Sequence, residues 1–549
     1  MKLLTYAVLG FGTVFVLNYT SCKTKTRESS EVLMTNTKPN IILIMSDDMG
    51  YSDLGVYGGE IDTPNLDALA NSGVKFTQFY NTARCCPTRA SLMTGLYPHQ
   101  TGIGHMTNPP DSNADDLGLP AYRGFLNKSN MTIAEVLKEN GYATLMTGKW
   151  HLGMAEQDQW PLQRGFDRFY GILAGASNYF EPDGNRGITI GNEQIEINDP
   201  DYYTTDAFTD NALKFIDESK SDYADKPFFL YLAYTAPHWP LQAKKEDIDK
   251  YRDRYKDGWG ALRQERYRRM QELGLIDDSV KLSEQDSRSW DSLSPEKQDE
   301  MALRRAIYAA QVDRMDQNIG KLVQHLEEKG LRENTIIVFL DDNGACAEGG
   351  MLGGGPADQL ETLEGYFLTY GQAWANASNT PFRKYKHWLH EGGISSPLII
   401  NWGDKISRKQ QGKTINQYGF LPDIMATFVD ITDASYPAEF KGNSMPDLEG
   451  ESLLPLLDGS NDEIHTEPIF WEHEGNKAVR LGEFKLVMEW KRENNNWELY
   501  NIDNDRSETN NLAAVYPEKV KELSQMWDKW ASDKGVEEWD KILELHKRK

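Results

Sequence analysis

The stretch Asn40-Ile41-Ile42-Leu43-Ile44-Met45-Ser46-Asp47-Asp48 decides the fold of this chain. Its apolar residues follow one another without alternation, which is typical of a parallel strand that is covered on both faces. Two carboxylates come directly after it. The same pattern recurs in Thr335-Ile336-Ile337-Val338-Phe339-Leu340, which is followed by Asp341-Asp342-Asn343. Both stretches predict buried parallel strands that end in acidic side chains.

Two weaker stretches show the same pattern. Ala143 to Met146 precedes Gly148-Lys149-Trp150-His151, and Phe228 to Tyr234 precedes Pro237-His238. Ligands of open α/β sheets bind at the carboxyl ends of the strands. We therefore expect the polar residues that follow all four strands to meet at one edge of a sheet.

Helix ends can also be located. Thr132-Ile133-Ala134-Glu135 is a capping box that opens a helix, which Gly141 can close. Ser294-Pro295 opens a longer helix with one apolar face, and Gly330 stands just past its end. The segment from Gln242 to Ser292 is polar, which indicates either an insertion near the mouth of a cleft or a solvated helical face.

Near the C-terminus the long apolar runs give way to short alternating ones, at residues 478–481, 484–490 and 497–500, followed by a helix from about Pro517. We predict an α/β fold with a large, mostly parallel sheet sandwiched by helices and a smaller C-terminal antiparallel sheet with a helix. The expected domains are a signal peptide (1–22), a polar tether (23–38), a main domain (39–466) and a C-terminal subdomain (467–549).

Charge restricts the partners. The net charge of this chain of 549 residues is -25. A nucleic-acid surface is not expected, because the phosphate backbone requires a basic footprint. A small anion is still possible as a ligand, since a few cations can dominate the field inside a cleft.

The N-terminus indicates export. The apolar stretch from Leu3 to Leu17 is too short to span a bilayer and predicts a signal peptide. It resembles a bacterial lipoprotein signal with Cys22 as the lipidated residue, although Tyr19 stands where leucine is usual. We expect a periplasmic or outer-membrane lipoprotein that contacts the membrane only through this anchor. Cys86 and Cys346 can form a disulfide or remain two buried thiols.

The acidic pairs favour a metal site. Asp47-Asp48 and Asp342-Asn343 supply hard oxygen ligands at two predicted strand ends. Such ligands suit Ca²⁺ or Mg²⁺ and argue against a zinc site of cysteine and histidine.

Cys85 opens a further motif, Cys85-Cys86-Pro87-Thr88-Arg89, with Thr94-Gly95 beyond it. On its own, Cys85 is equally well explained as a small buried hydrophobe. Pro87 suits the first turn of a helix and Gly95 can end it, which places Cys85 at a helix N-terminus, where anions are favoured.

The motif resembles the maturation signature of the type I sulfatases of the alkaline phosphatase superfamily, in which the first cysteine is oxidised to formylglycine. Gly148-Lys149-Trp150-His151-Leu152-Gly153, Ala236-Pro237-His238 and residues 380–386 are similar to further motifs of that family. Thr88 replaces the commoner serine, and Lys384-Tyr385 stand where two glycines are frequent.

The resemblance implies a site and a partner enzyme. It implies one set of residues that binds a divalent metal, normally calcium, and a second set that carries out the reaction. It also implies a formylglycine-generating or anaerobic sulfatase-maturing enzyme that oxidises Cys85. The metal set is Asp47, Asp48, Cys85, Asp342 and Asn343, and the catalytic set is Cys85, Arg89, Lys149, His151, His238 and Lys386.

The implied reaction is hydrolysis of a sulfate monoester. The cations neutralise the sulfate oxygens, and a formylglycine hydrate attacks sulfur. His238 is the candidate that protonates the leaving oxygen, with Lys386 as a second candidate, and His151 takes the proton whose loss releases sulfate. Alternatives are a phosphonate or phosphate ester hydrolase of the same superfamily and an inactive glycan-binding lipoprotein. The sequence does not choose between aryl and carbohydrate sulfates. Candidates for a wall that stacks on a substrate ring are Trp239, Trp259, Trp374 and Asn376.

Overall fold

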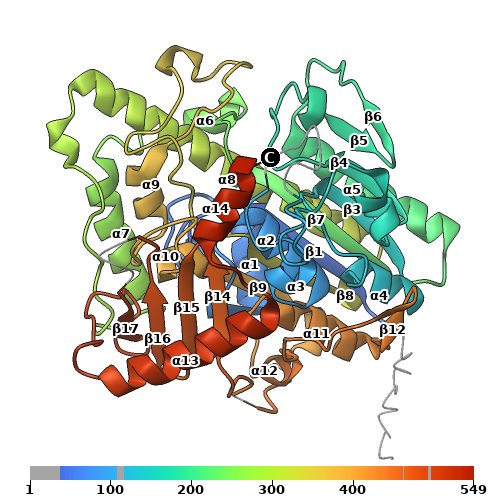
Figure 1. The fold of residues 1–549 in the computed structure, drawn as a ribbon. Helices are drawn as coiled ribbons and strands as arrows, with labels where there is room; N and C mark the ends of the chain where they lie inside the picture. Colours follow the sequence, from blue (N-terminus) through green and yellow to red (C-terminus); the bar gives the residue numbers. More distant parts are fainter. Residues whose placement is uncertain (1–37, 108–115, 462, 492–495, 549) are drawn as a thin grey trace, which may run out of the picture. The chain divides into compact units, whose positions relative to one another are not determined.

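A large mixed β-sheet forms the centre of the computed structural model, which describes residues 38–107, 116–461, 463–491 and 496–548 (Figure 1). Within this described part the sheet has 11 strands in the order β10-β2-β9-β8-β1-β7-β3-β4-β5-β6, and β11 pairs with β2. The strands are β1 (Asn40–Asp47), β2 (Val74–Tyr80), β3 (Ala143–Lys149), β4 (Arg168–Ile172), β5 (Ile188–Ile190), β6 (Glu193–Ile195), β7 (Phe228–Pro237), β8 (Thr335–Asp341), β9 (Ser395–Asn401), β10 (Thr414–Ile415) and β11 (Gly419–Phe420).

The four strands expected from the sequence are adjacent at the centre of this sheet. β1 pairs in parallel with β8 on one side and with β7 on the other, and β7 pairs in parallel with β3. The prediction of a mostly parallel sheet is confirmed. β9, which is antiparallel to both β8 and β2, was not foreseen.

Helices cover both faces of the sheet, as the uninterrupted apolar strands predict. In β1, Ile42 and Ile44 belong to one apolar core, while Leu43 and Met45 belong to the other. The first core includes α1 (Pro64–Ser72), α5 (Thr204–Asp222), α6 (Lys245–Tyr251), α7 (Gly258–Glu272), α8 (Pro295–Glu328) and α9 (Gly371–Ser378). The second includes α2 (Cys85–Thr94), α4 (Ile133–Glu139), α11 (Pro422–Thr432) and α12 (Leu454–Asp458).

The end signals of two helices are confirmed. Thr132 caps α4 through the expected capping box with Glu135, and Ser294 caps the long helix α8. The polar segment from Gln242 to Ser292 is more than a solvated helical face. It contains α6 and α7, whose aromatic side chains Tyr251 and Trp259 are buried in the first core.

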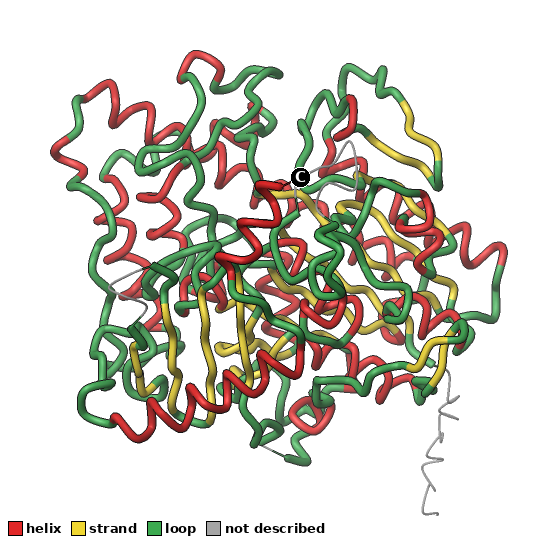
Figure 2. The backbone as a smooth tube through the Cα atoms, in the orientation of Figure 1, coloured by secondary structure: helices red, strands yellow, loops and turns green. Residues whose placement is uncertain are grey.

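A second sheet follows near the C-terminus (Figure 2). Its strands are antiparallel, in the order β14 (Ile469–His473), β15 (Asn476–Leu481), β16 (Phe484–Met488) and β17 (Glu498–Asn501). Trp527 and Trp530 of α13 (Pro517–Lys534) share one apolar cluster with it, as do Tyr80 and Ile394 of the main body. β14 was missed because its buried residues Glu472 and His473 break the apolar pattern.

The remaining α-helices and strands are short or terminal: α3 (Pro98–Thr101), α10 (Glu391–Ile394), β12 (Glu439–Phe440), β13 (Asn443–Ser444) and α14 (Trp539–Arg548). The expected boundary after residue 466 falls in the connection between α12 and β14. The expected signal peptide and nearly all of the tether, Cys22 included, lie outside the described residues. No helix of the described part combines the length and the hydropathy needed to cross a bilayer.

Candidate active site

The carboxyl ends of the four central strands bring the expected polar residues together. Ser46 of β1 lies opposite Asp341 of β8, and Asp47 lies opposite Pro237, the residue before His238. β3 approaches β7 closely at Gly148, where a Cβ atom would lie 1.8 Å from the Ala233 carbonyl oxygen. Glycine at this position therefore lets Lys149 reach the same edge.

One half of the site centres on Asp47. The Lys149 ammonium lies 2.6 Å from Asp47 Oδ2, and the Arg89 guanidinium lies 3.6 Å from the same oxygen. Arg89 also donates to Asp342 Oδ2 at 2.8 Å. All four side chains are fully buried. Buried charges of this kind are tolerated only because they are paired.

The other half centres on Asp48. Asn343 Nδ2 donates to Asp48 Oδ1 at 2.7 Å, and Lys386 Nζ lies 2.7 Å from the same oxygen. His238 Nε2 lies 3.3 Å from Asp48 Oδ2. Burial would raise the pKa of Asp48, but the charges of Lys386 and His238 outweigh it and hold the pKa below its ordinary value. Asp48 is therefore an anion, paired with the Lys386 ammonium.

Cys85 begins helix α2, and Gly95 ends that helix in the left-handed conformation, as expected. Ligand atoms of Cys85, Asp47 and Asp342 lie within 4.8 Å of one another. Arg89 is one helical turn after Cys85 and so shares its face of the helix. Burial raises the pKa of the Cys85 thiol, although Lys149 and Lys386 oppose this shift. A buried thiol of high pKa is a poor nucleophile without further chemistry.

The site fits a hard divalent cation. Oδ1 of Asp47 and Oδ1 of Asn343 are buried and accept no hydrogen bond from any described residue. Burial and the charge of Asp47 raise the pKa of Asp342 to about 7, which shows that its carboxylate lacks sufficient compensation from Arg89 and Lys149. Carboxylate and amide oxygens are the ligands that Ca²⁺ and Mg²⁺ prefer. The donor set therefore matches the metal expected from the sequence.

The two histidines differ in their surroundings. His238 Nδ1 lies 2.7 Å from the Trp239 carbonyl oxygen, so this nitrogen carries a proton and Nε2 faces Asp48. Burial lowers the pKa of His238 to about 4, with Lys386 adding to the effect and Asp48 opposing it. His151 Nε2 lies 3.3 Å from the Thr107 carbonyl oxygen. Burial and the charge of Lys149 hold the pKa of His151 well below its usual range, so its imidazole is neutral.

Backbone strain is present at two of these residues. Asp48 has φ 69° and His151 has φ 56°, both in the left-handed region. Such conformations cost of order 1–3 kcal/mol in residues other than glycine and are concentrated at functional sites. Here they direct side chains from two strand ends toward one point.

The expected catalytic and metal-binding residues are thus brought together. The prediction of a wall that stacks on a substrate ring is wrong for three of its four residues. Trp259, Trp374 and Asn376 are fully buried, and Trp259 packs edge-on against Trp374 in the core of the α8 side. Only Trp239 lies beside the site, with its ring 4.6 Å from that of His238. Cys86 and Cys346 are separate buried thiols.

Sequence reasoning missed Glu348 and Arg84. Glu348 lies 3.2 Å from Arg84, the residue before Cys85, and 3.9 Å from Lys386. Its side chain also accepts from the Trp239 indole at 2.8 Å. The position of Glu348 in a glycine-rich irregular segment carried no signal, because such segments show no periodicity.

Comparisons with known proteins agree with this site. The sulfatase family model matches residues 39–434, and the model described as N-sulphoglucosamine sulphohydrolase, C-terminal, matches residues 382–532. The chain is 34% identical to an uncharacterized sulfatase of Schizosaccharomyces pombe, with 91% of this chain and 94% of the relative covered. It is also 34% identical to an arylsulfatase of Klebsiella aerogenes, with 76% and 90% covered.

The fold is likewise shared with solved structures. The crystal structure of Ps i-CgsB superposes with a TM-score of 0.68 at 28% identity and covers 92% of this chain and 95% of its own. The same protein has been solved in complex with k-i-k-neocarrahexaose. The family match over most of the length and the 34% identity to two sulfatases show that the chain belongs to the sulfatase family and is a sulfuric ester hydrolase.

Proposed function

We propose that the protein hydrolyses sulfate monoesters with a formylglycine formed from Cys85 and a divalent metal, calcium or magnesium, bound beside it. The convergence of the Cys85 sulfur with the carboxylates of Asp47 and Asp342 within 4.8 Å carries the proposal. A thiol that is buried among carboxylates and has a raised pKa has little use as a nucleophile. The hydrate of a formylglycine would supply the attacking hydroxyl, and a second hydroxyl through which sulfate can leave.

The metal would be held by the oxygens of Asp47, Asp48, Asp342 and Asn343 together with residue 85. When bound, such an ion lowers the pKa of a coordinated hydroxyl and withdraws charge from a sulfate oxygen. Asp47 Oδ1 and Asn343 Oδ1 support this assignment, since no described residue donates to either oxygen.

Three cationic side chains would neutralise the negative charge of the substrate's sulfate group. A sulfate monoester resists attack because its anionic oxygens repel a nucleophile. Arg89, Lys149 and Lys386 surround residue 85 with positive charge, and each is held in place by one of the site's carboxylates. Because these cations are already oriented by Asp342, Asp47 and Asp48, little reorganisation is needed when the ester binds.

Two histidines are positioned for proton transfer. Nε2 of His238 is the nitrogen that faces the site, and a bound sulfate anion would favour its protonated form. We assign it to donate a proton to the leaving oxygen, with Lys386 as the other candidate. His151 is neutral, and its Nδ1 has no hydrogen-bond partner within the described chain, so it can accept the proton whose loss releases sulfate.

The rim beside His238 suits a substrate with a ring. Trp239 packs against Phe367, and the Arg186 guanidinium lies over the rings of Trp239 and Tyr366. Phe367 is 56% exposed although it is aromatic. Exposed aromatic faces stack on sugar or aryl rings. We propose a sulfated saccharide, which is also supported by the oligosaccharide complex of Ps i-CgsB.

The location of the protein is a further part of the proposal. The apolar stretch from Leu3 to Leu17 and the following Cys22 support an exported bacterial lipoprotein that is matured by a formylglycine-generating or anaerobic sulfatase-maturing enzyme. Mass spectrometry of the N-terminal peptide would detect a lipidated Cys22, and an unmodified residue 22 in membrane-extracted protein would contradict the anchor.

Release of inorganic sulfate tests the function. We expect the matured protein to release sulfate from one class of sulfated saccharides more efficiently than it releases phosphate or phosphonate from the matching esters. A higher kcat/KM on phosphonate esters would favour the rival hydrolase of the same superfamily. Trp239→Ala should raise KM for the saccharide more than for a small aryl sulfate, because only the saccharide reaches the aromatic rim.

A further inference from the structure

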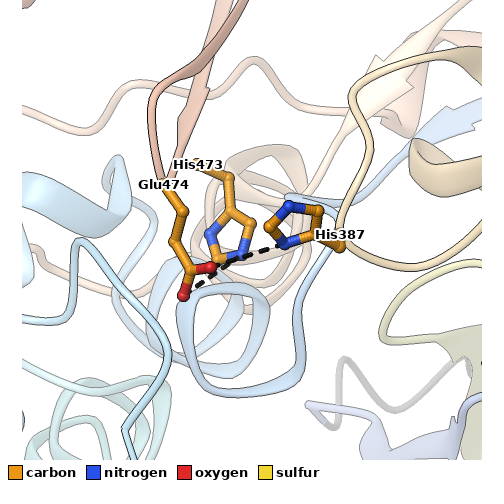
Figure 3. Close-up of side chains that lie close together, drawn as sticks. All are labelled: His387, His473 and Glu474. Carbon is orange, nitrogen blue, oxygen red and sulfur yellow. Dashed lines mark ion pairs between the residues drawn. The ribbon is translucent and has the colours of Figure 1, made fainter. Parts of the chain in front are cut away.

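A second group of possible metal ligands lies beside the active site, in the cluster His387, His473 and Glu474 (Figure 3). His473 ends strand β14, and Glu474 begins the turn to β15. His387 follows Lys386 in the loop before α10. The three side chains therefore join the C-terminal sheet to the loop that carries a residue of the active site.

The distances within the cluster are those of a ligand set. His387 Nδ1 lies 3.4 Å from Glu474 Oε2, and His473 Nε2 lies 3.8 Å from Glu474 Oε1. One ligand atom from each residue lies within 4.8 Å of the others. Zinc bound at about 2.0–2.1 Å in tetrahedral geometry places its ligand atoms roughly 3.3 Å apart. Small side-chain movements would bring all three to that separation.

His473 is the observation that points to a ligand. Its side chain is 1% exposed, and neither ring nitrogen hydrogen-bonds to any part of the chain that the structure describes. An unsatisfied buried polar group costs about 1–3 kcal/mol. The ring is therefore either a destabilising residue or a ligand.

Its protonation state agrees with the second explanation. Burial holds the pKa of His473 well below its usual range, with His387 and Arg84 adding to the effect, and burial also lowers the pKa of His387. Both imidazoles are neutral, which is the form that binds metals. The positive charge of Arg84 would oppose a cation bound at the two histidines. Arg84 is paired with Glu348 at 3.2 Å, so this charge is largely compensated.

We propose that His387, His473 and Glu474 bind a divalent transition-metal ion of the zinc class at a site separate from the active-site metal. Two imidazoles and one carboxylate suit Zn²⁺, whereas the oxygen ligands around Asp47 suit Ca²⁺. The proposal does not depend on the chemistry assigned to Cys85.

The ion would fix the position of two catalytic segments relative to the C-terminal sheet. The backbone N–H of His387 donates to the Ala83 carbonyl oxygen at 2.8 Å, two residues before Cys85, and Lys386 is the residue before His387. Asn476 Nδ2 donates to the His473 carbonyl oxygen at 2.9 Å, so the turn that carries His473 and Glu474 is tied to the start of β15.

Zinc binding to the purified protein tests the proposal directly. The chain is treated with chelator, saturated with Ca²⁺ to occupy the active site, and titrated with Zn²⁺ while bound zinc is measured by elemental analysis and calorimetry. We expect stoichiometric zinc in the wild type. Glu474→Gln and His387→Gln should each weaken binding at least roughly 10²-fold, since loss of outer contacts alone costs 10–100-fold.

Asp217→Asn is the matched control. It breaks another His–carboxylate pair, in which His325 Nε2 lies 3.0 Å from Asp217 Oδ1, and this pair joins α5 to α8, away from the cluster. It should leave zinc binding unchanged. Thermal unfolding without zinc shows that each variant is folded, and either Gln variant suffices if the other fails this check. The proposal is overturned if the Ca²⁺-saturated wild type binds no zinc, or if both folded Gln variants bind it as the wild type does.

Discussion

Two clusters of buried charges lie near the end of strand β1, and they differ in how fully the carboxylate oxygens are paired with donors. The active-site cluster contains Asp47 and Asp48, and a second cluster five residues later contains Asp53, Glu60, Arg266 and Arg305. Both combine carboxylates with cations that are almost completely inaccessible to solvent.

In the second cluster the chain satisfies every oxygen of Asp53. Oδ1 lies 2.7 Å from a guanidinium nitrogen of Arg266 and of Arg305, and Oδ2 accepts from Tyr308 at 2.7 Å and from the Gly50 N–H at 2.8 Å. In the active-site cluster, Asp47 Oδ1 has no donor among the described residues. Burial alone therefore does not distinguish the two clusters, whereas the unsatisfied oxygen of Asp47 does.

The largest expected effect is at the proposed nucleophile. Cys85→Ser should reduce turnover roughly 10³-fold or more, because a serine cannot form the hydrate and would retain sulfate after one attack. Stability should be unchanged, since serine fills nearly the same volume. Burst kinetics and intact mass measure this, and full multiple turnover by the variant would contradict the assigned nucleophile.

Proton donation by His238 should depend on the leaving group. General acid catalysis contributes about 10²–10⁴-fold where the leaving group needs protonation. His238→Ala should therefore lose about this much activity on an alkyl or sugar sulfate and far less on nitrophenyl sulfate, whose phenolate leaves unaided. Equal losses in kcat on both esters would remove His238 from this role.

A substitution in the second cluster should lower stability and not turnover. Asp53→Asn leaves Arg266 and Arg305 without their shared carboxylate and should lower the free energy of unfolding by about 3–5 kcal/mol in urea. Burial would raise the pKa of Asp53, but Arg305 and Arg266 lower it below the ordinary 3.8. This stabilisation is therefore present above pH 3.8 and is lost as the pH falls through the lower folded-state pKa.

A substitution in an exposed ion pair provides the reference for the loss of stability in Asp53→Asn. Asp217→Asn, which removes the surface pairs with His325 and Lys329, should change the free energy of unfolding by no more than about 1 kcal/mol. If Asp53→Asn costs no more than Asp217→Asn, the second cluster has no structural role and the contrast between the two clusters fails.

Metal addition should change stability less than breaking the second cluster does. Calcium at 100 times its Kd should stabilise the chelated protein by about 2.7 kcal/mol. Asp47→Asn should abolish this gain, because it replaces a negatively charged ligand by a neutral amide, while folded Asp53→Asn should keep it. Thermal unfolding with and without calcium measures both, and an undiminished gain in Asp47→Asn would exclude the site as the place where calcium binds.

Local sequence patterns predicted the elements that form the site. The apolar runs before Asp47 and Asp342 specified β1 and β8, and the cap at Ser294 specified α8, because buried parallel strands and helix ends carry strong local signals. The family motifs then identified Cys85, Lys149 and His238.

Features that depend on packing could not be predicted. Trp259 and Trp374 were expected at a cleft but fill the core, since composition does not show which neighbours surround an aromatic ring. The pairing of Glu348 with Arg84 and the meeting of His387 with His473 arise from loops brought together by the fold, and neither has a periodic signal in the sequence.

The chemical state of residue 85 tests the central claim most directly. Active protein is digested, and the peptide that contains residues 85–89 is examined by mass spectrometry. The account predicts an aldehyde at position 85, captured by an aldehyde-reactive reagent, in a fraction that rises with specific activity. Fully active protein in which residue 85 is entirely a cysteine thiol would contradict it.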